Sequence, residues 1–390
     1  MKSYEMTPRE RVLATVKGEP VDQVPVLYWF NSHAACKLFT EHKPAKSKLW
    51  NMLGSKSWNM YKKEFRFVPE DIRAALPLLL QVYANRDYAY ELGADLSNLQ
   101  FGNNKFWLDK IYIKGGKLRI KDGFGSIRGM GGIYLDVVEP VIKDFYDIKN
   151  FKFPDAKDDK HYTTIKKFRK KNPDQCLFVD NFGVQDLPST QIWEMSRFML
   201  ALYDYPDEMK EFQRKWADAT IDAAQRSIKA GADVIFLYDD YGYNDNTLLS
   251  MDMWKEFTLP QLKRQIDAIH ESGALVMLHS CGFQKPFLDH YVDAGLDILQ
   301  SLQPNAGNDF EESYEKYGDK LTFATGIDIV GGETMTPEEF SADIVKSYKI
   351  GGRNGRHILG TTHMLQYTMP TENVKAMIKT VENIRNGMFD

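Results

Sequence analysis

The chain reads GADVIFLYDD at residues 231–240 and GALVMLHSCG at residues 273–282. Each stretch begins with a glycine, continues with apolar residues that suit a buried strand, and ends in polar side chains. The residues between them, from Met253 to Ser272, are predicted to form a helix that Gly273 ends. Two strands joined by a helix of this length are typical of a βαβ unit with parallel strands. These residues therefore predict a parallel sheet covered by helices.

The same alternation extends through the second half of the chain and includes one strand near the N-terminus. Further strands are predicted at residues 24–28, 176–180, 298–299, 321–325 and 357–359. Further helices are predicted at residues 7–16, 206–230, 283–294, 336–350 and 371–386. The first of these helices has a capping box, because Glu10 follows three residues after Thr7. The number of strands is near eight, which predicts an α/β fold of the (β/α)8 TIM-barrel class.

An insertion-rich region precedes most of this alternation, at about residues 35–150. Its first part, to about residue 95, is helix-rich and aromatic and contains no clear strand. Lys110–Lys114 and Lys117–Lys121 then alternate charged and apolar residues across a Gly-Gly turn, which predicts a β-hairpin. A second pair of strands is predicted around Gly131 and Gly132. We therefore expect a single barrel domain, residues 1–390, with an N-terminal helical extension and an antiparallel β-hairpin insertion.

The composition excludes several classes of protein. The chain has 390 residues, of which 43% are hydrophobic and 27% are charged, and its net charge of −4 does not favour nucleic-acid binding. Three cysteines, Cys36, Cys176 and Cys281, argue against a disulfide framework and favour a reducing cytoplasm. Met1–Glu5 lack the apolar core of a signal peptide, and no apolar run approaches the ~18 residues of a membrane span. We expect a cytoplasmic protein without nucleic-acid or membrane partners.

Polar side chains follow the predicted strands, at the ends that a barrel brings together at one mouth. The polar residues at these ends include Asp180, Asn181, Tyr238, Asp239, Asp240, Tyr241, His279, Cys281, Gln300, Gln303, Thr361 and His363. Asp239 and Asp240 are either caps of the next helix or carboxylates that orient a ligand or transfer a proton. This repeated coincidence indicates a functional site at the carboxyl ends of the strands.

His279 and Cys281 suggest a metal site. They lie two residues apart at the end of a strand, so their side chains point the same way. A single histidine after a strand is more often a hydrogen-bonding core residue than a ligand. Cys281, and His363 at the end of another strand, favour a metal, because imidazole and thiolate suit zinc and catalytic zinc sites commonly use three protein ligands. We therefore predict Zn²⁺ on His279, Cys281 and His363.

Several motifs resemble those of the uroporphyrinogen decarboxylase superfamily. They are MTPRER (6–11), GEPVDQVP (18–25), GAD (231–233) with Asp239 and Asp240, HSCG (279–282), GLD (295–297) and Pro370-Thr371-Glu372-Asn373. The resemblance extends from about residue 6 to residue 384 and implies a (β/α)8 barrel. One branch of this superfamily decarboxylates a tetrapyrrole without a metal, and its arginine-rich segment holds the substrate carboxylates. The corresponding segment here, YWFNSH (28–33), contains no arginine.

The other branch contains zinc-dependent methyltransferases that work with corrinoid proteins. Their metal ligands resemble His-x-Cys with a distal cysteine shortly before the terminal Pro-x-Glu-Asn. His279 and Cys281 match this pattern, and the distal position falls on His363. A zinc site with one thiolate in place of two is a stronger Lewis acid. Such a site suits an oxygen leaving group, which favours demethylation of an O-methyl donor over methylation of a thiol.

The resemblance therefore implies a methyltransferase that moves a methyl group from an O-methyl donor, a methoxylated aromatic compound, to the Co(I) of a separate corrinoid protein. Zinc would bind the ether oxygen, and Asp239 or Asp240 would orient a ligand or protonate the leaving oxygen. The residues expected to contact the substrate are Tyr28, Asn181, Tyr238, Tyr241 and Gln303. No corrinoid-binding segment is visible, so a partner must deliver the cobalt. The sequence does not decide whether the protein is a monomer or a homodimer.

Three alternatives remain at this stage. A protein of the same fold could transfer a methyl group from a methyl-corrinoid to a thiol such as coenzyme M. The chain could also be a metal-free decarboxylase, or a non-catalytic binding protein for an aromatic ligand. Release of a phenol would identify demethylation of an O-methyl donor, and formation of a thioether would identify methyl transfer to a thiol. Zinc content distinguishes both methyltransferases from the metal-free decarboxylase.

Overall fold

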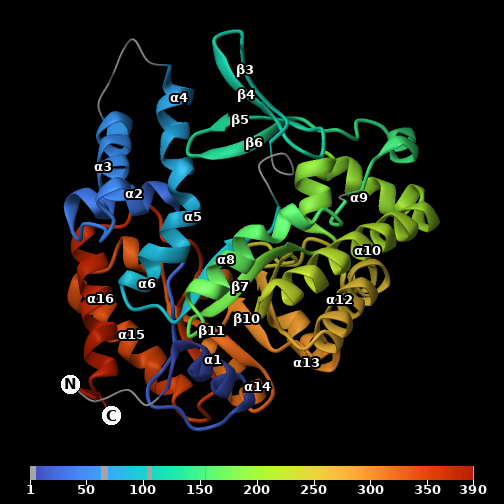
Figure 1. Cartoon of the computed structure of the whole chain (residues 1–390). Helices are drawn as coiled ribbons and strands as arrows, with labels where there is room; N and C mark the ends of the chain where they lie inside the picture. The colour runs from blue at the N-terminus through green and yellow to red at the C-terminus, as the bar shows by residue number, and fades with distance from the viewer. Residues whose placement is uncertain (1–5, 63–68, 103–107, 154, 390) are drawn as a thin grey trace.

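The computed structural model describes residues 6–62, 69–102, 108–153 and 155–389. Its centre is a parallel sheet of eight strands in the order β1-β12-β11-β10-β9-β8-β7-β2, which forms a nearly closed barrel (Figure 1). The strands are β1 (Val26–Leu27), β2 (Leu96–Gln100), β7 (Cys176–Phe182), β8 (Val234–Tyr238), β9 (Leu275–Ser280), β10 (Ile298–Ser301), β11 (Thr322–Ile327) and β12 (His357–Thr361). Between the two end strands, the Asp95 N–H donates to the Val26 carbonyl at 2.8 Å and bridges the seam.

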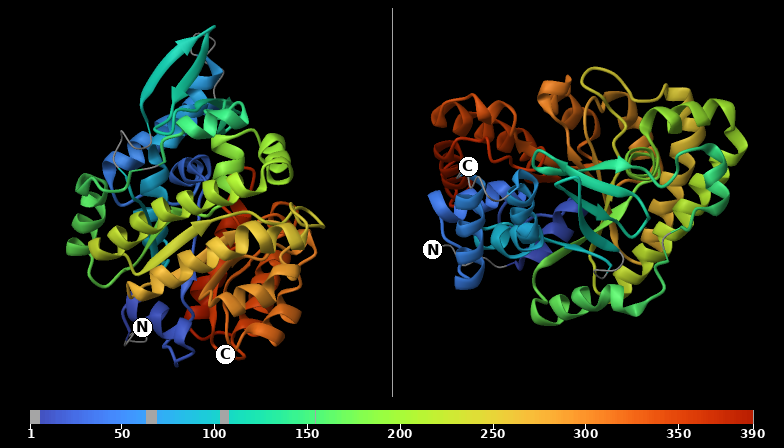
Figure 2. Two further views of the ribbon diagram at one scale, coloured as in Figure 1. Left: turned by 90° about the vertical axis from the view of Figure 1, so that its right-hand side faces the viewer. Right: turned by 90° about the horizontal axis from the view of Figure 1, so that it is seen from above.

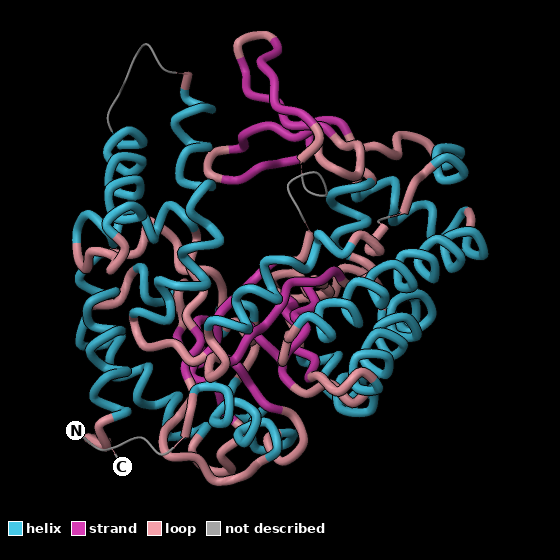
Figure 3. Tube along the Cα trace, viewed as in Figure 1, coloured by secondary structure: helices cyan, strands magenta, loops and turns pink. Residues whose placement is uncertain are grey.

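Helices surround these strands (Figure 3). The helices that follow the barrel strands are α8 (Thr163–Lys171), α10 (Pro206–Ala230), α12 (Leu259–Glu271), α13 (Leu288–Ala294), α14 (Phe310–Tyr317), α15 (Pro337–Gly351) and α16 (Thr371–Arg385), with α9 (Met195–Asp204) before α10. Trp216 of α10 and Ile266 of α12 belong to the same buried cluster as Leu237 of β8. This alternation of strand and helix confirms the predicted (β/α)8 class. No helix in the described ranges has both the length and the apolar character needed to cross a membrane.

The amino-terminal end of the barrel is closed by α1 (Pro8–Lys17). The predicted capping box is confirmed, because the Glu10 N–H donates to Thr7 Oγ1 and the Thr7 N–H donates to Glu10 Oε2. Val12 is buried with strand residues that point into the barrel. Arg11, also on α1, forms ion pairs with Asp22 at 2.7 Å and with the buried Asp95 at 2.5 Å. These ion pairs therefore fix α1 across the amino-terminal end of the barrel.

A cap lies over the opposite end, where the strands finish. It consists of helices α2 (Ser32–Glu41), α3 (Lys48–Lys62), α4 (Glu70–Ala75) and η1 (Leu76–Leu80), and of an antiparallel sheet, β3 (Lys110–Lys114), β4 (Lys117–Lys121), β5 (Ile127–Gly131) and β6 (Tyr134–Glu139). Viewed from above, this sheet crosses the middle of the molecule (Figure 2). The Leu118 N–H donates to Asp71 Oδ2 at 3.2 Å and joins the sheet to α4. The Tyr134 hydroxyl donates to Gln366 Oε1 at 3.0 Å and joins the sheet to the loop after β12.

Most of the predicted elements are present, with shifted ends. The predicted helix from Met253 to Ser272 consists of α11 (Met251–Met253), a π-helical turn η6 (Trp254–Thr258) and α12. The predicted helix 283–294 begins only at η7 (Lys285–Phe287), and the predicted strand 24–28 contains two residues in β1. The sequence analysis assigned no strand between the helix-rich region, which ends at about residue 95, and the hairpin at 110–121, so β2 was missed. The Met1–Glu5 segment lies outside the described residues.

The remaining short elements connect these parts. In the helix-rich region they are α5 (Gln81–Tyr83), η2 (Ala84–Tyr88) and α6 (Ala89–Glu91); after the cap sheet they are η3 (Phe145–Asn150), η4 (Asp159–Tyr162) and η5 (Pro188–Ile192); later in the chain they are η8 (Pro304–Ala306) and η9 (Gly331–Glu333).

Candidate metal centre and adjoining cavity

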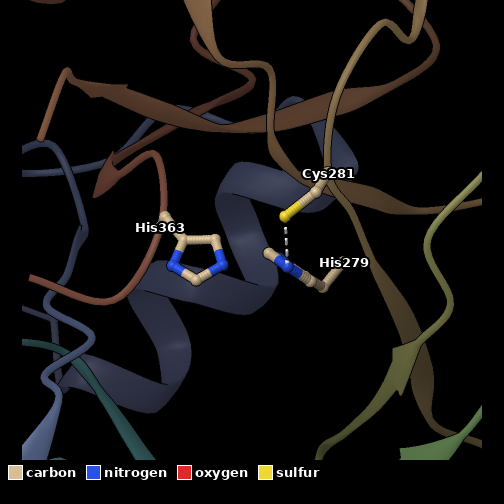
Figure 4. Close-up of side chains that lie close together, drawn as sticks. All are labelled: His279, Cys281 and His363. Atoms are coloured by element: carbon tan, nitrogen blue, oxygen red, sulfur yellow. Dashed lines mark hydrogen bonds between the residues drawn. The ribbon is translucent and has the colours of Figure 1, made fainter. Parts of the chain in front are cut away.

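His279 and Cys281 lie next to each other at the end of β9. His279 is 4% exposed, and Cys281 follows the last residue of the strand. The alternation of side chains along an extended chain brings both groups to the same side, and Cys281 Sγ lies 3.1 Å from His279 Nε2 (Figure 4). The spacing predicted from the sequence therefore places a thiol and an imidazole nitrogen in direct contact.

His363 approaches the same point from the loop after β12. Its ring centroid lies 5.3 Å from that of His279. One ligand atom from each of His279, Cys281 and His363 can be chosen so that all three atoms lie within 4.8 Å of one another. Figure 4 shows the three side chains converging from two separate segments of the chain. We call these three residues the His-Cys-His cluster.

The cluster fits a zinc ion in its donor chemistry and in its dimensions. Zinc bond lengths of about 2.0–2.3 Å imply ligand atoms roughly 3.3–3.8 Å apart in a tetrahedral site. The ligand atoms here lie within 4.8 Å of one another, so the widest pair needs to close by at most about 1.5 Å to reach that spacing. Burial lowers the pKa of His363 to about 4, so its imidazole is neutral and keeps a lone pair for a metal. Burial, and then Asp240, raise the pKa of Cys281, so a metal has to displace the thiol proton when it binds.

Gln300, on β10, orients the His279 ring. Its Oε1 is hydrogen-bonded to His279 Nδ1, and its Nε2 donates to the Thr361 carbonyl at 2.8 Å. Because the amide oxygen can only accept, Nδ1 carries the proton and Nε2 presents its lone pair towards Cys281. A neutral amide therefore occupies the position where many zinc-bound histidines have a carboxylate partner.

The two predicted acidic residues have different surroundings. Asp240 Oδ1 accepts from the Cys281 N–H at 2.7 Å and lies 3.8 Å from His279 Nε2, and its side chain is 34% exposed. Asp240 therefore lies beside the His-Cys-His cluster and can be reached by solvent or a ligand.

Asp239 is instead an anchor for the loop after β7. Its carboxylate accepts from the N–H groups of Val184, Gln185 and Asp186 at 2.6–2.9 Å and from the Tyr241 hydroxyl at 2.7 Å. Burial raises its pKa to about 6. A Cβ added at Gly183 would lie 2.0 Å from the carboxyl carbon of Asp239, so the loop needs glycine there to approach so closely. The prediction left Asp239 and Asp240 as equal candidates for catalysis, and these contacts favour Asp240.

A cavity of about 810 Å³ separates the barrel mouth from the cap. The barrel contributes polar and aromatic residues to its wall, among them Trp29, Asn98, Gln100, Asp180, Phe182 and Tyr238. The cap contributes mostly apolar side chains, among them Ile72, Leu76, Ile111, Leu118 and Ile120. The ring centroid of Trp29 lies 5.0 Å from that of His279 and 5.4 Å from that of His363. The cavity therefore adjoins the His-Cys-His cluster through the Trp29 ring.

The predicted substrate residues are distributed unevenly around this cavity. Tyr238 lines it. Asn181 points towards the outer helices, where its Nδ2 donates to the Thr220 carbonyl at 2.9 Å. Tyr28 is buried in the cluster beside α15 and α16, and the Tyr241 ring packs against Trp254 and Phe287. Tyr28, Asn181 and Tyr241 therefore stabilise the barrel and do not belong to the cavity wall.

Gln303, the last of the predicted substrate residues, belongs neither with Tyr238 in the cavity wall nor with the three residues that stabilise the barrel. Its Oε1 accepts from the Gly282 N–H at 3.2 Å, so it supports the turn that follows Cys281. The two residues before it, Ser301 and Leu302, have φ angles of 119° and 54°, which side chains other than glycine rarely adopt. Strained backbone of this kind clusters at functional sites. Gln303 therefore shapes the metal-side turn rather than the cavity.

Asp180, which the sequence placed among the polar residues at the strand ends, forms a polar pair in the cavity wall with Asn98, which the sequence did not assign to the site. Asn98 Nδ2 donates to Asp180 Oδ1 at 2.5 Å, and the Tyr238 hydroxyl donates to the same oxygen at 2.7 Å. Burial raises the pKa of Asp180 to about 6. Asn98 and Gln100 occupy alternate positions of β2, and this period of two was the signal that would have identified both the strand and its wall residues.

Comparison with known proteins agrees with this fold. Residues 129–384 match the family model described as uroporphyrinogen decarboxylase (URO-D). A uroporphyrinogen decarboxylase of Coxiella burnetii is 24% identical over 340 residues, which cover 82% of this chain and 88% of that protein. One from Methylobacillus flagellatus is 23% identical and covers 83% of this chain and 92% of its own length. A methyltransferase from Methanosarcina mazei superimposes with a TM-score of 0.65 at 19% identity, covering 99% of this chain and all of its own.

Proposed function

The chain belongs to the uroporphyrinogen decarboxylase family, and within this family we propose that it is a zinc-dependent methyltransferase. It would take a methyl group from a methoxylated aromatic compound and pass it to the Co(I) of a separate corrinoid protein. The observation that carries this proposal is the convergence of His279, Cys281 and His363 beside a large, mostly apolar cavity. Catalytic zinc sites commonly have three protein ligands and an open fourth position.

The residues around the cluster suit an oxygen leaving group. When the methyl–oxygen bond breaks, the bonding electron pair stays on the oxygen, which needs positive charge or a proton. Zinc bound by one thiolate and two imidazoles would supply a Lewis acid for that oxygen. Gln300 orients the His279 ring through an uncharged amide, so it adds no negative charge to the site. Asp240 stands close enough to His279 and Cys281 to orient a ligand or give a proton to the leaving group.

The cavity supports a reaction that brings two large groups together. Its volume of about 810 Å³ is in the range that holds drug-sized ligands and exceeds what one methoxyarene fills. Trp29, Phe182 and Tyr238 offer aromatic faces for a flat ring. The remaining space would let a corrin ring, carried by the partner protein, reach the methyl carbon from the side opposite the oxygen.

Two other activities of the same fold compete with this one. Transfer of a methyl group to a thiol would gain from a second thiolate on zinc, which neutralises the metal, and His363 does not provide it. Decarboxylation of a tetrapyrrole requires cations for the substrate carboxylates. YWFNSH (28–33) contains no arginine.

Zinc content and product analysis test the proposal together. The purified protein should contain one zinc per chain, and His279→Ala should lose it. His290→Ala is the matched control, because His290 lies on α13 with its ring against Trp254, and this variant should keep the metal. With a Co(I) corrinoid protein and a methoxyarene, the wild type should release the phenol. Formation of a thioether from coenzyme M instead would support the thiol reaction, and full activity in zinc-free protein would exclude the proposal.

A further inference from the structure

The charges on the cavity wall are unbalanced. Among the wall side chains in the described ranges, Arg128 is the one positive charge, whereas Asp122, Asp180 and Asp186 are acidic. The other polar groups of the wall are largely amides, including Asn31, Gln81, Asn85, Asn98, Gln100 and Gln191. A substrate that brings a carboxylate into this space therefore meets more negative than positive groups.

Arg128 is already paired. Its Nε lies 2.8 Å from Asp122 Oδ2, and the side chains are 19% and 3% exposed. Asp122 begins the turn between β4 and β5, where its Oδ1 accepts from the N–H groups of Phe124, Gly125 and Ser126 at 2.9–3.0 Å. These contacts fix Asp122 opposite Arg128, so a buried carboxylate already offsets the positive charge of the guanidinium before a ligand enters the cavity.

Asp180, the acidic group on β7, contacts uncharged side chains of the wall. Asn98 Nδ2 and the Tyr238 hydroxyl donate to its Oδ1 at 2.5 and 2.7 Å. Burial raises the pKa of Asp180 to about 6, which reflects how little solvent or opposite charge surrounds it. The wall therefore offers aromatic faces, apolar side chains and amides, which are the groups that recognise an uncharged ring with hydroxyl or ether oxygens.

We propose that this cavity takes methoxyarenes without an anionic group, and that the Asp122–Arg128 ion pair excludes their carboxylated analogues. The inference rests on the proposed function and specifies its substrate class. The pair belongs to the cap sheet, so the specificity lies in the insertion and not in the barrel. A buried carboxylate without a partner binds poorly, because burial removes its hydration.

Two compounds that differ in one carboxylate provide the test. Zinc-loaded protein is titrated, without the corrinoid partner, with 2-methoxyphenol and with 4-hydroxy-3-methoxybenzoate, and binding is measured by calorimetry. The methoxyphenol should bind at least about tenfold more tightly, since an unpaired buried charge costs that much or more. Equal or tighter binding of the benzoate, or no binding of either compound, would overturn the inference.

Asp122→Asn tests the ion pair itself. The asparagine Oδ1 can still accept the three N–H groups of the turn, but the charge opposite Arg128 is gone. The ratio of the two dissociation constants should shift about tenfold towards the benzoate, since a freed guanidinium can pair with a carboxylate. Asp109→Asn is the control: it removes the same charge from an exposed pair with Lys121 at 2.8 Å on the same sheet, and its ratio should equal that of the wild type. An unchanged ratio in folded Asp122→Asn would overturn the role of the pair.

A second variant covers a failure of Asp122→Asn to fold. Gln191→Lys adds a cation to the wall from η5, outside the cap sheet, and should shift the ratio in the same direction. An unchanged ratio in Gln191→Lys would count against the inference.

Turnover of the two compounds distinguishes a failure of this inference from a failure of the proposed function. If neither compound is demethylated but the binding preference holds, the function fails and the charge selection stands. If both compounds are demethylated equally well, the function stands and the charge selection fails.

Discussion

The His-Cys-His cluster and the cavity wall adjoin each other at the mouth of the barrel, but they are built differently. The cluster comes from the barrel itself, and the His279 side chain is tied through Gln300 of β10 to the Thr361 carbonyl of β12. The wall is shared with the cap, whose polar contacts to the barrel side run mainly to loops and helices, such as those from Lys37 to the Tyr367 and Met369 carbonyls and from Tyr134 to Gln366. Rigid strand ends hold ligands within the tolerance that metal chemistry needs, whereas an insertion can change its lining without disturbing them. Under the proposed function, the barrel would set the reaction and the cap would set which charges the substrate can carry.

Replacing His363 with cysteine should produce the largest change that leaves the fold intact. His363→Cys creates the His-Cys-Cys set, which should keep zinc but neutralise its charge. Demethylation should fall about 100-fold or more, the usual effect of losing one strong stabiliser of a developing oxyanion. The measurement is phenol release at equal zinc content, with His290→Ala as the variant that removes a histidine elsewhere.

If zinc-loaded His363→Cys retained full demethylation activity, the role assigned to the His-Cys-His cluster in the comparison with the cavity wall would be wrong. It would mean that the charge of the centre does not decide the leaving group, so the reaction would have to be controlled from the wall.

Removing the Asp239 carboxylate should have a large effect on stability. Asp239→Ala leaves three backbone N–H groups and the Tyr241 hydroxyl without their acceptor, in a buried loop. Each unsatisfied buried donor costs free energy, and we expect the free energy of unfolding to fall by about 3 kcal/mol. Urea unfolding measures this value. Asp239→Asn keeps one acceptor oxygen and should lose less.

The control for this prediction is Asp222→Ala, which removes a half-buried carboxylate paired with Arg226 along α10. Surface pairs of this kind contribute at most about 1 kcal/mol. If Asp239→Ala is as stable as this control, Asp239 is not an anchor, and it returns to the candidates for catalysis.

The sequence predicted the barrel side of the molecule better than the cap side. Apolar runs such as 234–238 and 275–278 indicated their strands, and the polar residues after them indicated the mouth. β2 was missed because Asn98 and Gln100 face the cavity, so the strand lacks an apolar run. The two polar residues that line the cavity are therefore the reason that the sequence did not indicate their strand.

The position of the cap could not be predicted from local patterns. The hairpin at 110–121 is evident from its alternation, but its placement over the mouth depends on contacts such as Tyr134 to Gln366, 232 residues apart. Gln300 shows the same limit within the barrel. Its place at a strand end was visible, whereas its bond to His279 depends on the register between β9 and β10, which pairs these two residues directly.

Gln300 should have a smaller, specific effect on the metal. Gln300→Leu removes the acceptor of His279 Nδ1, so the ring loses its fixed tautomer and orientation. Zinc affinity should fall about 10- to 100-fold, as is usual when the partner of a metal-bound histidine is lost. Competition with a chelator measures the affinity. Gln261→Leu, on the outer helix α12, should bind zinc like the wild type, and an equal affinity in Gln300→Leu would show that packing alone orients the ring.

The smallest expected effect concerns the pH dependence of stability at the cavity wall. The pKa of Asp180 is raised to about 6 in the folded protein, above its ordinary value of 3.8. The folded state therefore binds more protons than the unfolded state between these values, and the contribution of Asp180 to the free energy of unfolding falls as pH rises from about 4 to 6.

Asp180→Asn has no titrating group at this position, so its stability does not include this pH-dependent contribution. The difference in unfolding free energy, wild type minus variant, should decrease by about 2 kcal/mol between pH 4 and pH 7, since each pKa unit is worth about 1.4 kcal/mol. Measuring both proteins at each pH cancels the other titrating groups, the Asp240–Cys281 region included. A difference that stays constant with pH would mean that burial does not disfavour the charged Asp180 carboxylate in the folded protein, and the cavity wall on the barrel side would then be better solvated than its burial indicates.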